Sequence, residues 1–379
     1  AFLFSRGFIK TGLGKRIAYN LIAAFGSSSL RLAYALALSD LILAPATPSN
    51  TARVGGVIMP ITTSLAKAFG SEPQDGPRKI GSFLMQSIYQ VNTITSAMFQ
   101  TSMAGNTLVA ALALQSFGIG ITWGDWAMAA IVPGIIALII MPYFIYKVYP
   151  PEIKDAREAQ QMIKEELKGL GKMSFQEWVM LGVFVLALVL WATSQFTKID
   201  ATTVAFLGIS ILLATSVLVW DDVKSEKGAW DTLVWMGTLM GFAGFLSKLG
   251  FIKWATVLVG GYIPEGSWII AFVIAVLINT YSHYVFASLT AHISAMFVAF
   301  SAIAISAGAP PMLTLLMIAF TSNLCMSLTH YAAGPSPVIF NTGYVPQNTW
   351  WKLGFFASVI NLIIFMGLGS VWMKAIGMW

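Results

Sequence analysis

The stretch Ala46-Thr47-Pro48-Ser49-Asn50-Thr51-Ala52-Arg53-Val54-Gly55 interrupts an apolar run that begins near Leu30 and resumes at Val57. Each apolar arm has room for only ~15 helical residues, whereas a helix that crosses the ~30 Å hydrocarbon core of a bilayer needs ~20. The spacing therefore predicts a re-entrant helical hairpin. The hydroxyl, amide and backbone groups at its tip have to be buried in protein or face a water-filled cavity, so we expect the tip to form part of a binding site.

The composition predicts an all-α polytopic membrane protein of an inner or plasma membrane. Apolar residues make up 57% of the chain and charged residues 10%, and the mean hydropathy is +0.76. The chain opens at Ala1 inside a predicted helix, so we expect a truncated N-terminus. The uncharged runs long enough to cross are Trp126–Tyr146, Val179–Phe196, Ala201–Trp220 and Leu353–Met373, with weaker candidates at 80–112, 232–245 and 312–340.

The charged residues of the loops indicate orientation and no further chemistry. Six Lys and Arg residues between Lys147 and Lys172 mark a cytoplasmic segment, of which 152–172 is predicted to be a solvated helix. The segment 117–126 has no Lys or Arg and is predicted to be external. The net charge of +6 comes largely from such loops, so no nucleic-acid partner is predicted. Four tryptophans are predicted to anchor the chain at the membrane interface, namely Trp123, Trp126, Trp350 and Trp351.

No metal site or cofactor is predicted. The single cysteine, Cys325, excludes an internal disulfide and a cysteine-based metal cluster. His283 and His330 have no acidic cluster nearby in the sequence, so we interpret them as interior residues.

The chain repeats itself. Four short matches occur in the same order, with offsets of 243, 239, 229 and 227 residues: Gly7-Phe8-Ile9-Lys10 with Gly250-Phe251-Ile252-Lys253, Ser49-Asn50-Thr51-Ala52-Arg53 with Ser288-Leu289-Thr290-Ala291-His292, Ala104-Gly105-Asn106-Thr107 with Ala333-Gly334-Pro335-Ser336, and Thr122-Trp123 with Thr349-Trp350. Secondary transporters are often built from two inverted copies with the binding site between them. We therefore expect two opposed hairpin tips and two broken helices to meet near the midplane, where helix N-termini favour an anion.

These motifs resemble the divalent anion/sodium symporter family, whose members carry a Ser-Asn-Thr signature on each of two opposed hairpins. The runs that carry the likeness to the bacterial citrate/succinate, tartrate/succinate and 2-oxoglutarate/malate antiporter branch are Thr11-Gly12-Leu13-Gly14-Lys15-Arg16, Ala44–Arg53 and Ala332-Ala333-Gly334-Pro335-Ser336-Pro337. The likeness covers the whole chain and lacks only the family's first helices. It implies a homodimeric, inverted-repeat elevator-type transporter that exchanges di- or tricarboxylates, with a scaffold at 1–29 and 151–265 and a transport domain at 30–150 and 266–379.

The same resemblance assigns the substrate contacts. The first tip contributes Ser49, Asn50 and Thr51, the second tip Ser288 and Thr290, and the two breaks Gly105, Asn106, Thr107, Gly334, Pro335 and Ser336. Hydroxyl, amide and backbone donors suit a carboxylate because they bind it without adding a full charge to a site that moves through a low-dielectric layer.

Two departures from the family pattern disfavour sodium. The second signature has Leu289 in place of the amide residue, and Pro45 stands where sodium-coupled members have a serine or threonine. Arg53 and His292 occupy equivalent positions, which suggests fixed countercharges in place of sodium ions. An alternative for Arg53 is an ion pair with Asp40 across the hairpin; the alternative function is sodium-coupled dicarboxylate symport.

Other classes of function fit less well. A membrane-embedded enzyme needs a set of ionisable residues at bilayer depth, and Asp40 is the only acidic candidate there. Two hairpins that close on one site argue against a channel. The sequence has no nucleotide-binding Gly-x-x-x-x-Gly-Lys-Ser/Thr motif, which excludes a primary pump.

Overall fold

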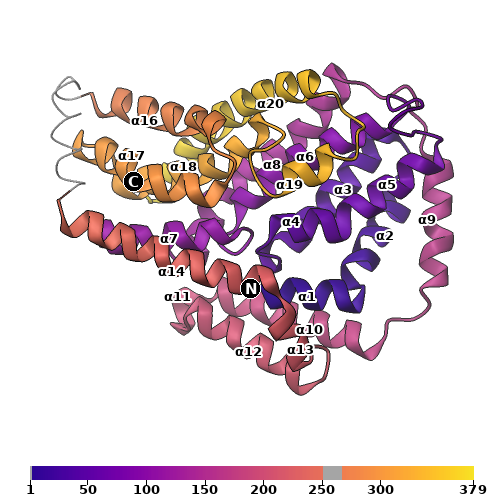
Figure 1. Cartoon of the computed structure of the whole chain (residues 1–379), viewed down its shortest axis with the longest axis horizontal. Helices are drawn as coiled ribbons and strands as arrows, with labels where there is room; N and C mark the ends of the chain where they lie inside the picture. The colour runs from indigo at the N-terminus through magenta and orange to yellow at the C-terminus, as the bar shows by residue number, and fades with distance from the viewer. Residues whose placement is uncertain (1, 251–266) are drawn as a thin grey trace.

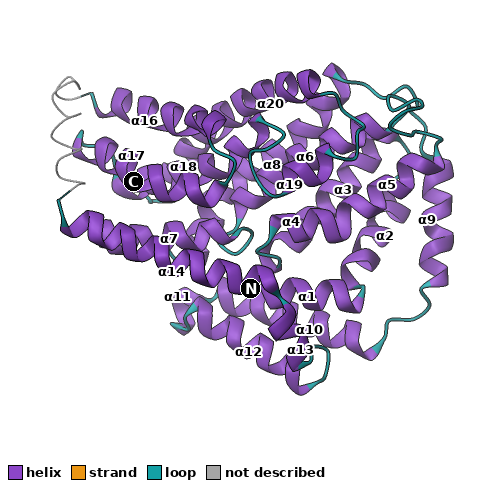
Figure 2. Ribbon diagram, in the orientation of Figure 1, coloured by secondary structure: helices purple, strands orange, loops and turns teal. Residues whose placement is uncertain are grey.

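The computed structural model describes residues 2–250 and 267–379, and within these ranges every regular element is a helix (Figures 1 and 2). In these two ranges, seven helical segments are long and apolar enough to cross a membrane: Ser29–Ala46, Trp123–Val148, Phe175–Ala192, Trp268–Val285, Leu289–Ser306, Pro311–Leu328 and Gln347–Ala375. The repeated residues 251–253 and the predicted domain boundary at 265/266 lie outside the described ranges.

The first copy consists of a hairpin, a broken helix and a long helix. Two helices precede it, α1 (Phe2–Thr11) and α2 (Leu13–Phe25). The hairpin comprises α3 (Ser29–Leu43), η1 (Ala44–Ala46), α4 (Asn50–Arg53), η2 (Val54–Ile58) and α5 (Met59–Ala68); α6 (Gly81–Met98) and α7 (Ala104–Phe117) form the broken helix, and α8 (Trp123–Val148) follows.

The second copy has the same elements in the same order. Its hairpin comprises α16 (Trp268–Ser282), η3 (His283–Val285) and α17 (Leu289–Ser306); α18 (Pro311–Leu324), η4 (Cys325–Leu328) and α19 (Pro335–Phe340) form the broken helix, and α20 (Gln347–Leu362), η5 (Ile363–Gly369) and α21 (Ser370–Ala375) complete it. In Figure 1, α16 and α17 lie on the opposite side of the molecule from α3 and α5.

The hairpin tips are shorter than the sequence suggested. The helix after the first tip begins at Asn50, because Ser49 caps it by accepting a hydrogen bond from the Ala52 amide at 3.1 Å. The expected break of ten residues is therefore reduced to Thr47–Ser49. The second tip is capped in the same way, since Ser288 accepts from the Ala291 amide at 3.3 Å. The first arm, α3, has the 15 residues that the spacing predicts.

The segment between the copies contains α9 (Arg157–Gly169), α10 (Phe175–Ala192), α11 (Ser194–Thr197), α12 (Ala201–Ala214), α13 (Trp220–Ser225) and α14 (Lys227–Lys248). The predicted solvated helix is present as α9. The predicted span Ala201–Trp220 is wrong, because α12 ends at Ala214 and Ser216 turns the chain with a φ of 57°. Fourteen residues give a helix of about 21 Å, which is too short to cross the core.

The two broken helices form the interior. Every residue of α6 is buried, and α6 packs against α3, α8 and α18. Three of the four tryptophans that the sequence placed at the interface belong to this core, and Trp123 is the least buried of the three. Trp126 and Trp350 are fully buried; Trp126 donates to the Ala97 carbonyl at 2.8 Å, and Trp350 packs on Tyr89 with ring centroids 4.4 Å apart. A tryptophan can lie at the membrane interface or in a core where its N–H finds a partner, so residue type alone did not show that the surrounding helices cover both rings.

Candidate functional site

A cavity of ≈ 180 Å³ lies between the two hairpin tips and the two helix breaks. α19 packs directly on α4 beside it, so elements from both copies meet there (Figure 1). None of the described residues that line it is charged. The lining residues are Phe2, Pro48, Ser49, Asn50, Thr51, Met103, Ala104, Ala287, Ser288, Leu289, Thr290, Ala333 and Gly334.

The first tip is held by its own side chains and approaches the second break closely. The Asn50 side chain accepts from the Thr51 amide at 3.0 Å and donates to the sulfur of Met326 at 3.7 Å. A Cβ atom on Gly334 would lie 2.1 Å from the Thr51 Oγ1. Only glycine therefore permits this approach, which places the Thr51 hydroxyl against the backbone of the second break.

The second tip supplies hydrogen-bond donors to the cavity. The backbone N–H groups of Leu289 and Thr290 follow the Ser288 cap, and no described atom accepts from them. The hydroxyl of Thr290 likewise has no partner among the described residues. N–H groups without an acceptor at a helix N-terminus attract a negative charge. The cavity is thus suited to a small anion that contacts both tips.

Six of the eleven predicted contacts line this cavity: Ser49, Asn50, Thr51, Ser288, Thr290 and Gly334. The other five, Gly105, Asn106, Thr107, Pro335 and Ser336, lie outside its lining. Direct contact between these five and a substrate stays a prediction.

The five residues outside the lining secure the helix breaks. The Asn106 amide donates to the carbonyls of Ser96 at 2.8 Å and Phe99 at 2.9 Å, where α6 ends. The hydroxyl of Ser336 accepts from the Ala333 amide at 3.1 Å and lies 2.8 Å from the Tyr89 hydroxyl. Each of these side chains satisfies backbone or hydroxyl groups that the break leaves unpaired.

The remaining three residues pack around the same breaks. A Cβ atom on Gly105 would lie 2.7 Å from Ile293, Thr107 donates to the Ala104 carbonyl at 2.7 Å, and Pro335 is the buried first residue of α19. Sequence reasoning selected polar residues and so missed apolar lining residues such as Phe2 and Met103, which carry no polar signal.

Arg53 is buried in a cage of oxygen atoms. Its Nε donates to the Asp40 carboxylate at 2.9 Å, and both residues are almost completely inaccessible. The other four N–H groups donate to the carbonyls of Thr47 and Ser102 and to the hydroxyls of Thr95 and Ser96, at 2.8 to 3.3 Å. All five donors of the guanidinium are therefore used inside the protein.

This geometry supports the alternative interpretation of Arg53, and its role as a fixed countercharge in place of sodium stays a prediction. The ion pair with Asp40 that the sequence left open is present, and Asp40 also accepts from Asn92 and Thr95. Arg53 does not line the cavity. Its charge is compensated within the hairpin, one turn behind the tip.

His292 is also fully buried and does not line the cavity. Its Nε2 lies 3.1 Å from the Ser282 hydroxyl, and its ring centroid is 4.8 Å from that of His283. No described residue forms an ion pair with it. Its role as a countercharge stays a prediction.

A larger cavity of ≈ 790 Å³ adjoins the first one, and Pro48 lines both. One wall comes from η1, α7 and the turn before α8, and the other from α1, α10 and the segment 198–205. Lys198 and Asp200 bring opposite charges to this wall. This cavity was not predicted from the sequence, because its walls come from distant segments that carry no shared motif.

A small cavity walled by two capped hairpin tips and two helix breaks, in a protein whose described residues include seven helices of membrane-spanning length, defines a multi-pass membrane transporter. The model of the family described as "Sodium:sulfate symporter transmembrane region" matches residues 1–379. The chain belongs to this family, the divalent anion/sodium symporters. The predicted family, the membrane location and the expectation of a transporter in place of an enzyme are confirmed.

Several relatives match the whole chain. "Putative malate transporter YflS" of Bacillus subtilis (strain 168) is 51% identical and is covered over 80% of its length. "Dicarboxylate transporter 1, chloroplastic" of Spinacia oleracea is 47% identical and covered over 67%, and "Inner membrane protein YbhI" of Escherichia coli (strain K12) is 42% identical and covered over 80%.

A solved structure shares the fold. Neisseria gonorrhoeae MtrF, described as illuminating a class of antimetabolite efflux pumps, superposes with a TM-score of 0.63 over 97% of this chain and 80% of its own. The two sequences are 14% identical, so the likeness concerns the fold alone.

Proposed function

We propose that the protein is a secondary transporter that exchanges di- or tricarboxylates of the succinate, malate, 2-oxoglutarate or citrate class, independently of sodium, by an elevator mechanism. The names of the relatives support the substrate class, since they include malate and dicarboxylate transporters at 47 to 51% identity. Sodium-coupled dicarboxylate symport is the alternative within the family.

One observation carries the substrate class. The cavity places a Ser-x-Thr tip on each of two walls, with unspent hydroxyl and amide donors and no charged residue among the described lining. A molecule with a carboxylate at each end makes hydrogen bonds to both tips. A cavity of about 150 Å³ holds a molecule of the size of benzene, so a cavity of ≈ 180 Å³ accommodates a small organic acid.

The cage around Arg53 supports independence from sodium. Its acceptors are a carboxylate, two carbonyls and two hydroxyls, the hard oxygen ligands that also suit alkali and alkaline-earth ions. The guanidinium fills this position and is covalently attached, so it cannot leave with the substrate. At the second tip, Leu289 removes the amide that sodium-coupled relatives carry.

We infer obligate exchange from the hydrogen-bond donors that stay on the protein when the substrate leaves. The helices that begin at Asn50 and Leu289 keep their positive N-terminal ends and unspent N–H groups on the moving domain. Carrying these groups through a low-dielectric layer costs free energy unless a bound anion satisfies them. The loaded domain is therefore the form that crosses, and flux requires a carboxylate on both sides.

The domain assignment is part of the proposal. Residues 1–29 and 151–265 form the scaffold, residues 30–150 and 266–379 form the transport domain, and two copies of the chain associate through their scaffolds. The identical order of hairpin, broken helix and long helix in the two copies supports this arrangement. Inverted topology predicts that the two tips open toward opposite sides of the membrane.

Counterflow in proteoliposomes tests the transport mode. Purified protein is reconstituted with or without internal succinate, malate, 2-oxoglutarate or citrate, and uptake of the labelled acid is measured with and without sodium. We expect uptake only with an internal di- or tricarboxylate, at a rate that sodium does not change. Sodium-dependent uptake into liposomes that hold no carboxylate would establish symport and refute exchange.

Cysteine labelling tests the architecture. Ser49→Cys and Ser288→Cys are introduced separately into a Cys325→Ala background, which removes the single native thiol. We expect a membrane-impermeant reagent to label the two positions from opposite faces and in opposite conformational states. Labelling of both from one face in one state would overturn the inverted arrangement.

A further inference from the structure

The two copies of the repeat have different residues at the equivalent positions around Arg53 and His292. The tip offset of 239 residues relates Asp40 to Asn279 and Arg53 to His292. The offset of 229 at the helix breaks relates Ser96 to Cys325. In the first copy these residues form the oxygen cage that holds the guanidinium. In the second copy the imidazole of His292 stands in place of the guanidinium, and the thiol of Cys325 in place of the Ser96 hydroxyl; both are softer ligands than oxygen.

His283 presents a free nitrogen lone pair to this position. Its Nε2 lies 2.9 Å from the Ala332 carbonyl, and because a carbonyl only accepts, Nε2 carries the ring proton. The Nδ1 atom is then an acceptor. It is buried, and no described group donates to it.

His292 is in the same protonation state for a similar reason. The Ser282 hydroxyl donates to the Asn279 carbonyl at 2.9 Å, so it accepts from the Nε2 of His292 at 3.1 Å. The Nδ1 of His292 is a second buried acceptor with no described partner. An N–H bond to an outer oxygen is the usual way in which a protein orients a histidine that ligates a metal.

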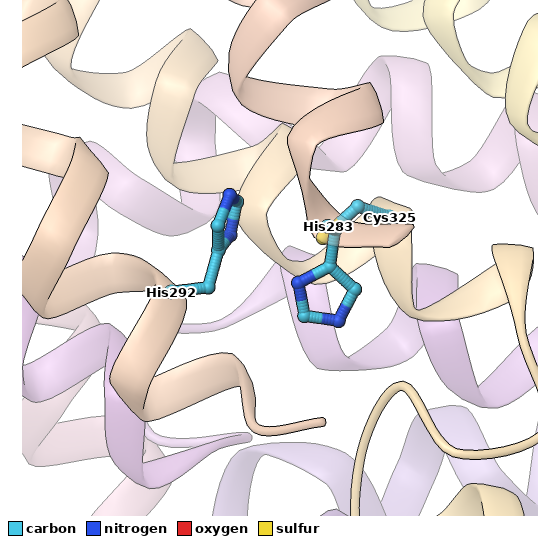
Figure 3. A group of neighbouring side chains, drawn as sticks. All are labelled: His283, His292 and Cys325. Carbon is cyan, nitrogen blue, oxygen red and sulfur yellow. The ribbon is translucent and has the colours of Figure 1, made fainter. Parts of the chain in front are cut away.

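Cys325 supplies the third ligand atom. It is fully buried, and its Sγ, one nitrogen of His283 and one of His292 all lie within 4.8 Å of one another. Figure 3 shows the three side chains gathered from three segments: η3 at the end of the first arm, α17, and η4 at the break of the second broken helix. No metal site was predicted from the sequence, because 32 residues separate His292 from Cys325 and the two do not form a local ligand motif.

We propose that the Nδ1 atoms of His283 and His292 and the Sγ of Cys325 bind a Zn²⁺-class cation. Zinc takes imidazole and thiolate ligands at about 2.0–2.3 Å, which sets tetrahedral ligands roughly 3.3–3.7 Å apart. Side-chain movements of ~1 Å bring the three atoms to that spacing. The thiol loses its proton to solvent on binding, so Zn²⁺ and the thiolate carry a net charge of +1. The guanidinium at the equivalent position of the first copy carries the same charge.

Such a cation would act on the second tip. His292 lies two residues after Thr290 on α17, and Cys325 belongs to the helix break, so the metal joins the hairpin to the broken helix. Resting on the proposed function, we expect the added positive charge to strengthen binding of a dicarboxylate at the adjacent cavity. Binding of the metal itself does not depend on that function.

Metal titration of the purified full chain tests the site. After chelator treatment, Zn²⁺ is titrated against a chromophoric chelator and the bound metal is counted after dialysis. Co²⁺ is added in parallel, because a thiolate ligand gives it a sulfur-to-metal charge-transfer band. We expect one metal per chain for the native protein, with that band present. No bound metal, or Co²⁺ bound without the band, would overturn the proposal.

Matched variants separate the ligands from other residues. Cys325→Ser restores the hydroxyl of the equivalent Ser96 and should abolish the band; His283→Gln and His292→Gln should abolish stoichiometric binding. Ser282→Ala removes only the outer acceptor and should weaken binding roughly ten- to a hundredfold. His330→Gln is the control, because His330 is the remaining histidine and instead accepts from Trp351 at 3.0 Å. Unchanged affinity in both Cys325→Ser and His292→Gln would refute the site, whether or not dicarboxylate exchange is observed.

Discussion

Replacing Gly334 by alanine should close the cavity from the side of the second break. The added Cβ would lie 2.1 Å from the Thr51 Oγ1 and 3.3 Å from its Cβ. Thr51 is β-branched, so its Oγ1 moves only by a change of rotamer or by a shift of the whole tip. Either movement displaces a hydroxyl that lines the cavity.

The expected loss of dicarboxylate affinity follows from the steric overlap between the added Cβ and Thr51. Overpacking a well-packed position costs about 1–3 kcal/mol. If that free energy opposes the arrangement that binds substrate, the affinity falls roughly fivefold to 150-fold. Dicarboxylate affinity is measured on the purified protein by calorimetry, and exchange in proteoliposomes is measured beside it.

Three further variants isolate the cause. The double variant Gly334→Ala/Thr51→Ala also removes the opposing hydroxyl. Gly334→Ala should therefore lower the affinity less in the Thr51→Ala background than in the native chain. Gly105→Ala, at the equivalent break, meets only the movable ends of Ile293 and Met103 and should have a smaller effect. Gly367→Ala meets nothing within 4 Å and should leave affinity unchanged. Native affinity in Gly334→Ala would refute the placement of the cavity.

Three other predictions concern charge and hydrogen bonding. Arg53→Gln should destabilise the protein by about 3–5 kcal/mol, because it leaves Asp40 buried without its partner, and Asp40→Asn in the same chain should recover most of the loss in thermal unfolding. Thr290→Ala should reduce dicarboxylate affinity roughly ten- to a hundredfold, at an unchanged unfolding temperature, through the loss of a charge-assisted hydrogen bond; native affinity would exclude this hydroxyl from the site. Burial raises the pKa of the Asp222 carboxyl, but the hydrogen bond from Lys10 and other nearby donors and charges hold that pKa below its ordinary value. The stability it contributes is therefore present above about pH 4 and is lost as the pH falls through the lowered pKa, so Asp222→Asn should flatten the acid limb of an unfolding profile.

The repeat allowed much of the architecture to be predicted from the sequence. Ser49 and Ser288 are found as equivalent helix caps 239 residues apart, and both line one cavity. These features are local: a serine before a helix satisfies N–H groups of its own first turn. The end of α12 was missed because its apolar run continues past the turn at Ser216.

Contacts between distant segments could not be predicted in the same way. The sequence allowed a pair between Arg53 and Asp40, but it did not reveal that Ser102 and Thr95, from the broken helix, complete the cage. That arrangement depends on the axial position of α6 relative to the hairpin, which hydrophobic periodicity does not specify. The buried Trp126 was misplaced for the same reason, since burial depends on neighbours as well as on residue type.

The caps at Ser49 and Ser288 also determine how the site selects its ligand. Each tip is folded by its own hydrogen bonds, so loading requires little ordering of the backbone, which costs about 1–2 kcal/mol for each residue that is fixed. A preorganised pair of tips does not adapt readily to its ligand. Under the proposed function, the fixed distance between the two caps therefore selects acids by the separation of their carboxylates. Acids whose carbon chain is too short or too long to contact both tips are excluded.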